Sequence, residues 1–233
     1  MTPFSALIFD ASDPRADESL LLEASVFLKE FGNTPEQLSE EYDIYRDYSF
    51  ILCVVDNINS TVAGMSRVIV PNDVVGLKSI NDISRYWPEI PLCEPPLSEP
   101  QIWDIGTLAI AEPYQAPMSA GLIGLGMYQS IIGLAQALEV DTMIALLDSK
   151  VHRMTRWKYH APFDIVPGAV AKPYLGSDVT FPVYSKISTW DNHLRQKDYN
   201  IYEIIFLGKG IEEALSPLAI EDGAALIRDM QLS

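Results

Sequence analysis

One carboxylate in this sequence lies where a charged side chain is costly. Asp104 falls in the middle of the apolar, β-rich stretch 102–111, where it needs either a partner or a function. Trp103 and the other apolar neighbours are expected to raise the pKa of this carboxyl group, which suits a general base that accepts a proton from an ammonium group. The alternative is a structural carboxylate paired with Arg67, and such pairing is compatible with either role.

The cysteines and histidines form no recognisable reactive set. Cys53 lies in an apolar run and Cys93 in a proline-rich loop, so we predict neither a disulfide framework nor a zinc site. The 3 histidines are scattered, without the spacing of metal ligands. We therefore expect chemistry without a metal.

The composition limits the class of the protein and of its partners. The chain has 233 residues, of which 48% are hydrophobic and 21% charged, as is typical of one large globular domain. Its formal charge of −16 argues against nucleic acid or an anionic membrane surface as the main partner. No apolar run is long enough to span a membrane, and residues 1–14 lack the features of a signal peptide. A cytoplasmic protein is the expectation.

The segment 101–148 is predicted to form the unit that positions Asp104. Its pattern indicates a strand over 102–111, a loop over 112–120, a helix over 121–138 and a strand over 141–147. The helix is apolar around much of its circumference, so we expect it to lie buried against a sheet. A strand–helix–strand unit of this length predicts two adjacent parallel strands. The helix N-terminus would suit an anionic group such as a pyrophosphate, although an ordinary structural crossover has the same pattern.

The remaining elements follow from apolar spacing and turn residues. Before the central unit we predict helices over 16–31, 34–45 and 79–86, and a hairpin of strands over 48–56 and 61–70. The proline-rich stretch 71–100 is predicted to be a long ordered loop that either covers a substrate or simply packs. After the central unit we predict a basic helix over 149–159, a β-arm over 163–187, and helices over 194–207, 210–215 and 220–230.

The loop of the central unit resembles a known motif. The residues EPYQ at 112–115 follow an apolar strand, and small residues then lead into the helix. This arrangement resembles motif A of the GNAT superfamily of acyltransferases, in which a Gln/Arg-x-x-Gly-x-Gly/Ala loop holds the pyrophosphate of coenzyme A. This chain has QAPMSAG at 115–121, with the Gln in place and with Pro117, which has no N–H group to donate.

The N-terminal half resembles a narrower group, the acyl-homoserine lactone synthases and related N-acyl amino acid synthases. The matching residues are VF at 26–27, FGN at 31–33, EY at 41–42, Tyr45, Asp56 and AGMSRV at 63–68. Those enzymes join a long acyl chain from a thioester to an amine. In that family an Arg on the second hairpin strand and upstream acidic residues shape the site; Arg67 and either Asp43 or Asp47 stand in comparable places.

The resemblance implies a fold class and a division of the chain. We expect an α/β sandwich of the GNAT type, with a mixed central sheet whose two parallel strands splay apart, helices on its faces and a C-terminal helical extension. Residues 1–193 would form the acyltransferase domain, and 194–233 the helical extension packed on the same domain.

The resemblance also implies roles for individual residues. The catalytic candidates are Asp104, Arg67 and Tyr159, the last as the proton donor to the leaving thiolate. The residues expected to bind the donor are Leu108, Ala109 and Ile110 at the splay, Gln115, Ala116, Ser119, Ala120 and Gly121 in the loop and helix start, and Arg153 in the basic helix. Those expected to contact the other substrate are Trp103, Thr107 and Trp157.

We therefore predict an N-acyltransferase that moves an acyl group from acyl-coenzyme A or acetyl-coenzyme A to a small amine. The acidic chain makes a carrier protein a less favourable donor than a small thioester. The alternative is a GNAT-like module that binds acyl-coenzyme A, a fatty acid or another protein without turnover. The sequence leaves open the length of the acyl chain, the identity of the acceptor and the oligomeric state, for which a homodimer is one alternative. Strands 102–111 and 141–147 paired along their whole length would contradict the transferase prediction.

Overall fold

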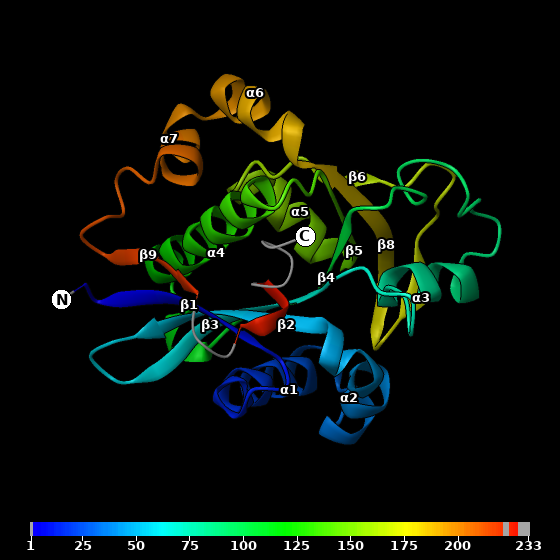
Figure 1. Cartoon of the computed structure of the whole chain (residues 1–233), viewed down its shortest axis with the longest axis horizontal. Coiled ribbons are helices and arrows are strands. Elements are labelled where there is room, and N and C mark those ends of the chain that lie inside the picture. Colours follow the sequence, from blue (N-terminus) through cyan, green and yellow to red (C-terminus); the bar gives the residue numbers. More distant parts are fainter. Residues whose placement is uncertain (1, 221–223, 228–233) are drawn as a thin grey trace.

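The computed structural model describes residues 2–220 and 224–227, which contain one mixed sheet of nine strands with helices on both faces (Figure 1). The strands are β1 (Phe4–Asp10), β2 (Ser49–Asp56), β3 (Thr61–Ile69), β4 (Ile102–Ile110), β5 (Thr142–Asp148), β6 (Asp164–Ile165), β7 (Lys172–Tyr174), β8 (Ser177–Lys186) and β9 (Leu215–Ile220). The helices are α1 (Asp17–Phe31), α2 (Pro35–Tyr42), α3 (Lys78–Tyr86), α4 (Pro117–Ala137), α5 (Ser149–Lys158), α6 (Ile187–Lys197) and α7 (Tyr199–Leu207).

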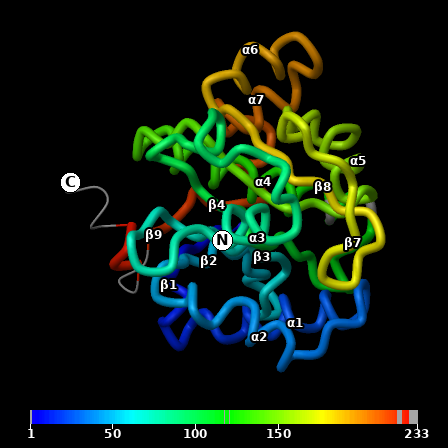
Figure 2. The backbone as a smooth tube through the Cα atoms, turned by 90° about the vertical axis from the view of Figure 1, so that its right-hand side faces the viewer, coloured from blue at the N-terminus to red at the C-terminus, as the bar shows by residue number. Residues whose placement is uncertain are grey.

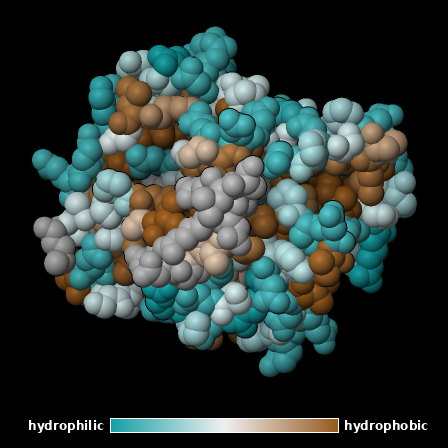
Figure 3. Space-filling model, in the orientation of Figure 1, coloured by the Kyte–Doolittle hydropathy of each residue, from teal (hydrophilic) through white to brown (hydrophobic). Residues whose placement is uncertain are grey.

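The helices divide between the two faces of the sheet. Figures 1 and 2 show α1 and α2 on one face and α4, with α6 and α7, on the other. The apolar helix α4 carries the largest core, in which Met127 and Ile132 pack on Phe50 and Leu52 of β2. Each predicted N-terminal helix has a specific cap at one end: α1 ends at Gly32 with φ of 74°, and α2 begins with a capping box from Thr34. The face shown in Figure 3 carries both hydrophilic side chains and separate hydrophobic patches.

The strand order places the predicted parallel pair in the middle of the sheet. The order is β6-β8-β5-β4-β3-β2-β1-β9, with β7 also paired to β8. Strands β4 and β5 are parallel, but they pair only from Ile102 with Thr142 to Asp104 with Ile144. Beyond this point β4 stays with β3, and β5 stays with β8. The predicted separation of the two strands is confirmed.

A β-bulge in β4 accompanies the separation. Arg67 of β3 lies opposite Thr107, whereas the next residue, Val68, lies opposite Ile105, so Gly106 is the extra residue. The hydroxyl of Tyr42 donates a hydrogen bond to the Gly106 carbonyl at 2.9 Å. A bulge bends the strand that contains it, and here it lies just past the last residue of β4 that pairs with β5.

A buried ion pair ties α1 to the strands beside this bulge. The Arg67 guanidinium donates to both carboxylate oxygens of Glu23, and Thr107 donates to the same carboxylate at 2.6 Å. Glu23 is 2% exposed and Arg67 5% exposed. Helix α1 is therefore fixed to the sheet by charged as well as apolar contacts.

The two ends of the chain differ from their sequence predictions. The predicted extended lead-in forms strand β1 within the sheet. The helix predicted over 210–215 is wrong: residues 210–214 form a bend and a turn, and strand β9 begins at Leu215. Strand β9 runs parallel to β1 and covers what would otherwise be its open edge, while Leu215 packs against α4. The helix predicted over 220–230 lies largely outside the described residues. The division at residue 193 falls within α6 and stays a prediction.

No helix in the described part of the chain is both long enough and apolar enough for a bilayer crossing.

Removing one partner of the buried pair should destabilise the fold strongly. Glu23→Ala leaves the Arg67 guanidinium buried and uncompensated, so the free energy of unfolding should fall by about 3–5 kcal/mol, measured by urea denaturation. The double variant Glu23→Leu with Arg67→Met removes both charges and should recover most of that loss. An unchanged midpoint in Glu23→Ala would contradict this role of the pair.

Candidate active site

A cavity of about 740 Å³ occupies the space between the separated parts of β4 and β5. Its walls include residues 105–110 of β4 and 145–148 of β5, together with residues from α1, α4, α5 and the turn between β7 and β8. The facing edges of the two strands have no partner strand among the described residues. The Gly106 and Ile110 carbonyls accept side-chain hydrogen bonds from Tyr42 and Gln115, and the other main-chain polar groups on these edges can be satisfied by a ligand.

The part of the cavity under α4 is apolar and aromatic. It is lined by Tyr128 and Ile131 of α4, Met143 of β5, and Tyr159 and Phe163, which follow α5. The rings of Tyr128 and Tyr159 lie 5.2 Å apart between centroids. Burial raises the pKa of Tyr159 to about 12, so its phenol keeps its proton at neutral pH.

Helix α4 can lie over Tyr159 only because residue 124 is a glycine. A Cβ atom on Gly124 would come within 2.3 Å of the Tyr159 hydroxyl oxygen. Gly133, on the same helix, has nothing within 4 Å of a Cβ atom built there. The two glycines therefore allow the packing at Gly124 to be tested within one helix.

The part of the cavity under α2 and α3 is polar. Tyr42, Lys78, Ser79 and Tyr174 line it. The Lys78 ammonium donates to Glu41 at 2.6 Å, to Asp82 at 2.7 Å and to the Tyr174 hydroxyl oxygen at 2.8 Å. Burial lowers the pKa of Lys78 and the adjacent carboxylates raise it, with a net rise, so Lys78 is a permanent cation of this wall.

Asp104 lies directly behind this polar wall. Its carboxylate is fully buried and accepts hydrogen bonds from the main-chain N–H of Ser79 at 2.5 Å and from the Ser79 hydroxyl at 2.7 Å. Burial raises its pKa and the bonds from Ser79 lower it, with a net pKa of about 6. Asp104 itself does not line the cavity, but Ser79, whose hydroxyl donates to the carboxylate, does.

Asp104 does not pair with Arg67, which was one of the two alternatives from the sequence. Because of the bulge, Thr107 lies opposite Arg67, and Asp104 lies opposite Ile69. The partner of Arg67 is Glu23, and the partner of Asp104 is the N-terminal turn of α3, where a carboxylate also complements the helix dipole.

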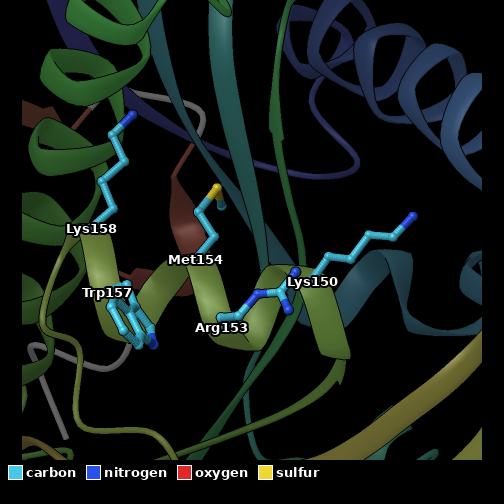
Figure 4. Close-up of a pocket in the computed structure, with 5 residues that line it drawn as sticks. All are labelled: Lys150, Arg153, Met154, Trp157 and Lys158. Carbon is cyan, nitrogen blue, oxygen red and sulfur yellow. The ribbon is translucent and has the colours of Figure 1, made fainter.

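A shallow basic groove of about 490 Å³ runs along the exposed face of α5 (Figure 4). It is lined by Lys150, Arg153, Met154, Trp157 and Lys158. Trp157 is 80% exposed. Lys158 lies beside the start of α4, since a Cβ atom on Gly121 would be 3.8 Å from its Cε atom. The first turn of α4 contains no acidic residue and has no side-chain cap, so this region favours an anionic group.

The structure brings many of the sequence-predicted residues to one place. Leu108, Ala109, Ile110, Gln115, Thr107 and Tyr159 line the cavity, and Arg153 and Trp157 line the α5 groove. Ala116 caps the start of α4, and Ser119, Ala120 and Gly121 belong to its first turns. Three predicted residues lie outside both linings: Asp104 is bound to Ser79 behind the polar wall, Trp103 is fully buried with its ring against Phe50, and Arg67 is bound to Glu23.

The sequence reasoning missed most of the polar wall. Lys78 and Tyr174 are in contact although 96 residues separate them, and no local pattern connects them. Ser79 carried one usable signal: it stands at the start of the predicted helix 79–86, and a helix N-terminus needs an acceptor. A buried acidic residue elsewhere, such as Asp104, was a candidate for that acceptor.

No protein-family model matches the sequence, and no curated protein matches it. Among solved structures, the chain is similar to FeeM, an N-acyl amino acid synthase from uncultured soil microbes, with a TM-score of 0.61 and 11% identity over 83% of this chain and 96% of that one. It is also similar to BjaI, a CoA-dependent acyl-homoserine lactone synthase solved with SAM and isopentyl-CoA, with a TM-score of 0.56 and 11% identity over 98% of this chain and 99% of that one. The fold is GNAT-like. The fold predicted from the motif resemblance is thus confirmed.

A third similar structure is that of the AHL synthase LasI, with a TM-score of 0.54 and 15% identity over 80% of this chain and 91% of that one. At such identities the likeness concerns the course of the chain and not its chemistry. The roles of individual residues therefore depend on the geometry of this cavity.

Adding one methyl group at two positions of α4 should have opposite effects. Gly124→Ala forces the Tyr159 ring or the helix to move, which should lower the free energy of unfolding by about 1–3 kcal/mol. Gly133→Ala meets open space and should raise it by about 0.5–1 kcal/mol, because alanine favours a helix. Chemical denaturation measures both changes. Equal stabilisation by the two substitutions would show that Tyr159 does not lie against Gly124.

Proposed function

We propose that this protein is an acyltransferase that moves an acyl group from a coenzyme A thioester to an amine. The observation that carries the proposal is the cavity between β4 and β5, at the point where their pairing stops. An extended pantetheine arm needs a narrow slot with exposed main-chain N–H and C=O groups, and the free edge of residues 105–110 supplies one. This assignment also agrees with the GNAT-like fold.

The basic groove supports coenzyme A as the carrier of the acyl group. Lys158 next to the uncapped start of α4 would hold the pyrophosphate, and Lys150 and Arg153 would attract the remaining phosphate. The exposed ring of Trp157 offers a stacking surface for a base. Pro117 removes one N–H donor from the first turn of α4, where the side chain of Lys158 would compensate with charge.

The apolar part of the cavity supports an acyl group longer than acetyl. Tyr128, Ile131, Met143 and Phe163 surround a space that continues beyond the splay. Each methylene of the acyl chain buried there should stabilise the complex by roughly 0.8 kcal/mol. The length of the preferred acyl chain is therefore set by the point at which these side chains close the cavity.

The polar wall supplies a path for the proton that the amine must lose. The nitrogen of the amine attacks the thioester carbon, a C–N bond forms and the C–S bond breaks. The ammonium form of the amine must lose two protons. The first would pass to the Ser79 hydroxyl while that hydroxyl passes its own proton to Asp104, and after product release the same hydroxyl would carry the proton back to the cavity. The second leaves the nitrogen once the C–N bond has formed; Tyr159 is the candidate donor to the leaving thiolate, and this second proton would replace the one that its phenol gives up.

The first test is thiol release from acyl-coenzyme A of several chain lengths with a panel of amines. Asp104→Asn should lower kcat by about 10²–10⁴-fold, because the general base is lost. The activity of the unmodified protein should fall as the pH drops through about 6, where the Asp104 carboxylate becomes protonated. This pH dependence should be absent from Asp104→Asn.

Coenzyme A binding that raises the melting temperature without any thiol release would instead favour a non-catalytic sensor.

Ser79 variants separate proton transfer from helix capping. Ser79→Ala keeps the main-chain bond to Asp104 but removes the hydroxyl that connects it to the cavity, so kcat should fall while the melting temperature changes little. In the unmodified protein the bond from the Ser79 hydroxyl lowers the pKa of Asp104, so its removal should raise that pKa. The loss of activity at acidic pH should therefore begin at a higher pH in Ser79→Ala. Ser79→Thr restores a hydroxyl and should restore most of the activity. Full activity in Ser79→Ala would rule out the path.

Charge in the α5 groove should control donor affinity. Lys158→Ala and Arg153→Ala should each raise the KM for acyl-coenzyme A about tenfold, which corresponds to about 1.4 kcal/mol. The kcat of Arg153→Ala should stay nearly constant, because Arg153 does not line the cavity. That of Lys158→Ala should change more, since the Lys158 ammonium lies 5.4 Å from the centre of the Tyr159 ring. The matched control is Lys197→Ala, an exposed lysine of α6 outside the groove. Equal effects in all three variants would place the donor phosphates elsewhere.

A further inference from the structure

The polar wall of the cavity also carries information about the acceptor. If the proposed function holds, the donor occupies the α5 groove and the splay, so the amine must reach the thioester from the side of α1, α2, α3 and the β7–β8 turn. Tyr42, Lys78, Ser79 and Tyr174 line that side of the cavity. The charge that this wall presents therefore selects the acceptor.

Lys78 in this wall and Arg67 behind it already have partners for their charged groups. An ammonium group has three N–H donors, and those of Lys78 are matched by Glu41, Asp82 and Tyr174. The Arg67 guanidinium is paired with Glu23, and its carbon lies 4.8 Å from the centre of the Tyr42 ring. Neither cation can bind a further carboxylate without breaking contacts that hold the wall together.

The carboxylates near the wall outnumber its cations. Glu23, Glu41, Asp82 and Asp104 face only Arg67 and Lys78. At the surface, Glu30 of α1 and Asp178 of β8 are exposed and line the same cavity. Lys150 and Lys158 are further lining cations, but both belong to the α5 groove, which we assign to the donor. In the low dielectric of this wall, a carboxylate on the acceptor would meet like charge with no cation to receive it.

We infer that the acceptor is a primary amine without a carboxylate, and that a second cationic group on it improves binding. An α-amino acid would place a negative group beside its reacting nitrogen, against the wall that lacks a free cation. The inference thus separates this protein from FeeM, an N-acyl amino acid synthase with a similar fold. It depends on the proposed function for the direction of approach, but it concerns only the acceptor.

The test uses pairs of amines that differ by one carboxylate. Tyramine is compared with tyrosine, and 1,4-diaminobutane with ornithine, each with a fixed long-chain acyl-coenzyme A and the full-length protein. Amide product is measured by mass spectrometry and thiol release by absorbance. In each pair we expect kcat/KM to be at least about 100-fold higher for the amine without the carboxylate. A 100-fold ratio corresponds to a difference of about 2.7 kcal/mol in activation free energy, at about 1.36 kcal/mol per tenfold.

The possible outcomes distinguish the inference from the proposed function. Equal or faster reaction of tyrosine or ornithine would overturn the inference and leave the acyltransferase intact. No thiol release with any amine would overturn both.

Surface variants give a second readout. Glu30→Gln with Asp178→Asn removes two exposed charges that line the cavity, so it should not impair folding. It should raise the KM for 1,4-diaminobutane several-fold and change that for tyramine less. Identical KM values for both amines in the variant and the unmodified protein would contradict a role for the acidic side of the cavity.

Discussion

The early end of pairing between β4 and β5 is the constraint on which the rest of the site depends. Only residues 102–104 of β4 are paired with β5, and the bulge at Gly106 comes directly after them. Past this point each strand keeps its outer neighbour, so the sheet remains continuous on both sides while a gap opens in its centre. A buried α/β sheet normally pairs the edges of all inner strands, because unpaired main-chain groups are costly. A gap at this place is therefore consistent with a ligand site.

Polar contacts hold the walls of the gap open. The Glu23 carboxylate joins α1 to β3 and β4 through Arg67 and Thr107, and Asp104 anchors α3 to β4 through Ser79. On the opposite face, α4 lies close to Tyr159 at Gly124 and to the β3 strand at Gly64. The cavity is thus bounded by an apolar side, which suits an acyl chain, and by an acidic side, which suits a cation.

Much of this arrangement follows from local sequence patterns. The strand–loop–helix–strand unit was predicted because an apolar strand, a small-residue loop and an apolar helix leave little choice of connection, and the strand residues 108–110 and Gln115 accordingly line the cavity. Asp104 was recognised because a carboxylate in an apolar strand is costly. Its partner was not, since Ser79 lies on α3, 25 residues earlier, and the bulge that keeps Asp104 away from Arg67 is not revealed by a single glycine in the sequence.

The features that the sequence did not reveal depend on contacts between distant segments. The contact of Lys78 with Tyr174 requires the β7–β8 turn to fold back over α3, and strand β9 exists because β1 offers it an edge. The run SPLAI at 216–220 has no strong pattern of its own, and the sequence predicts a connection over 216–219 between two helices. In both cases tertiary packing, and not local propensity, decides the structure.

The most direct test of the central claim is amide hydrogen exchange of the protein with and without a non-hydrolysable thioether analogue of a long-chain acyl-coenzyme A. The account predicts that residues 105–110 of β4 and 145–148 of β5 become more protected at saturation, while the paired residues of β1 and β2 do not change. Saturating binding that leaves exchange in residues 105–110 unchanged would show that the donor does not enter the gap between the strands.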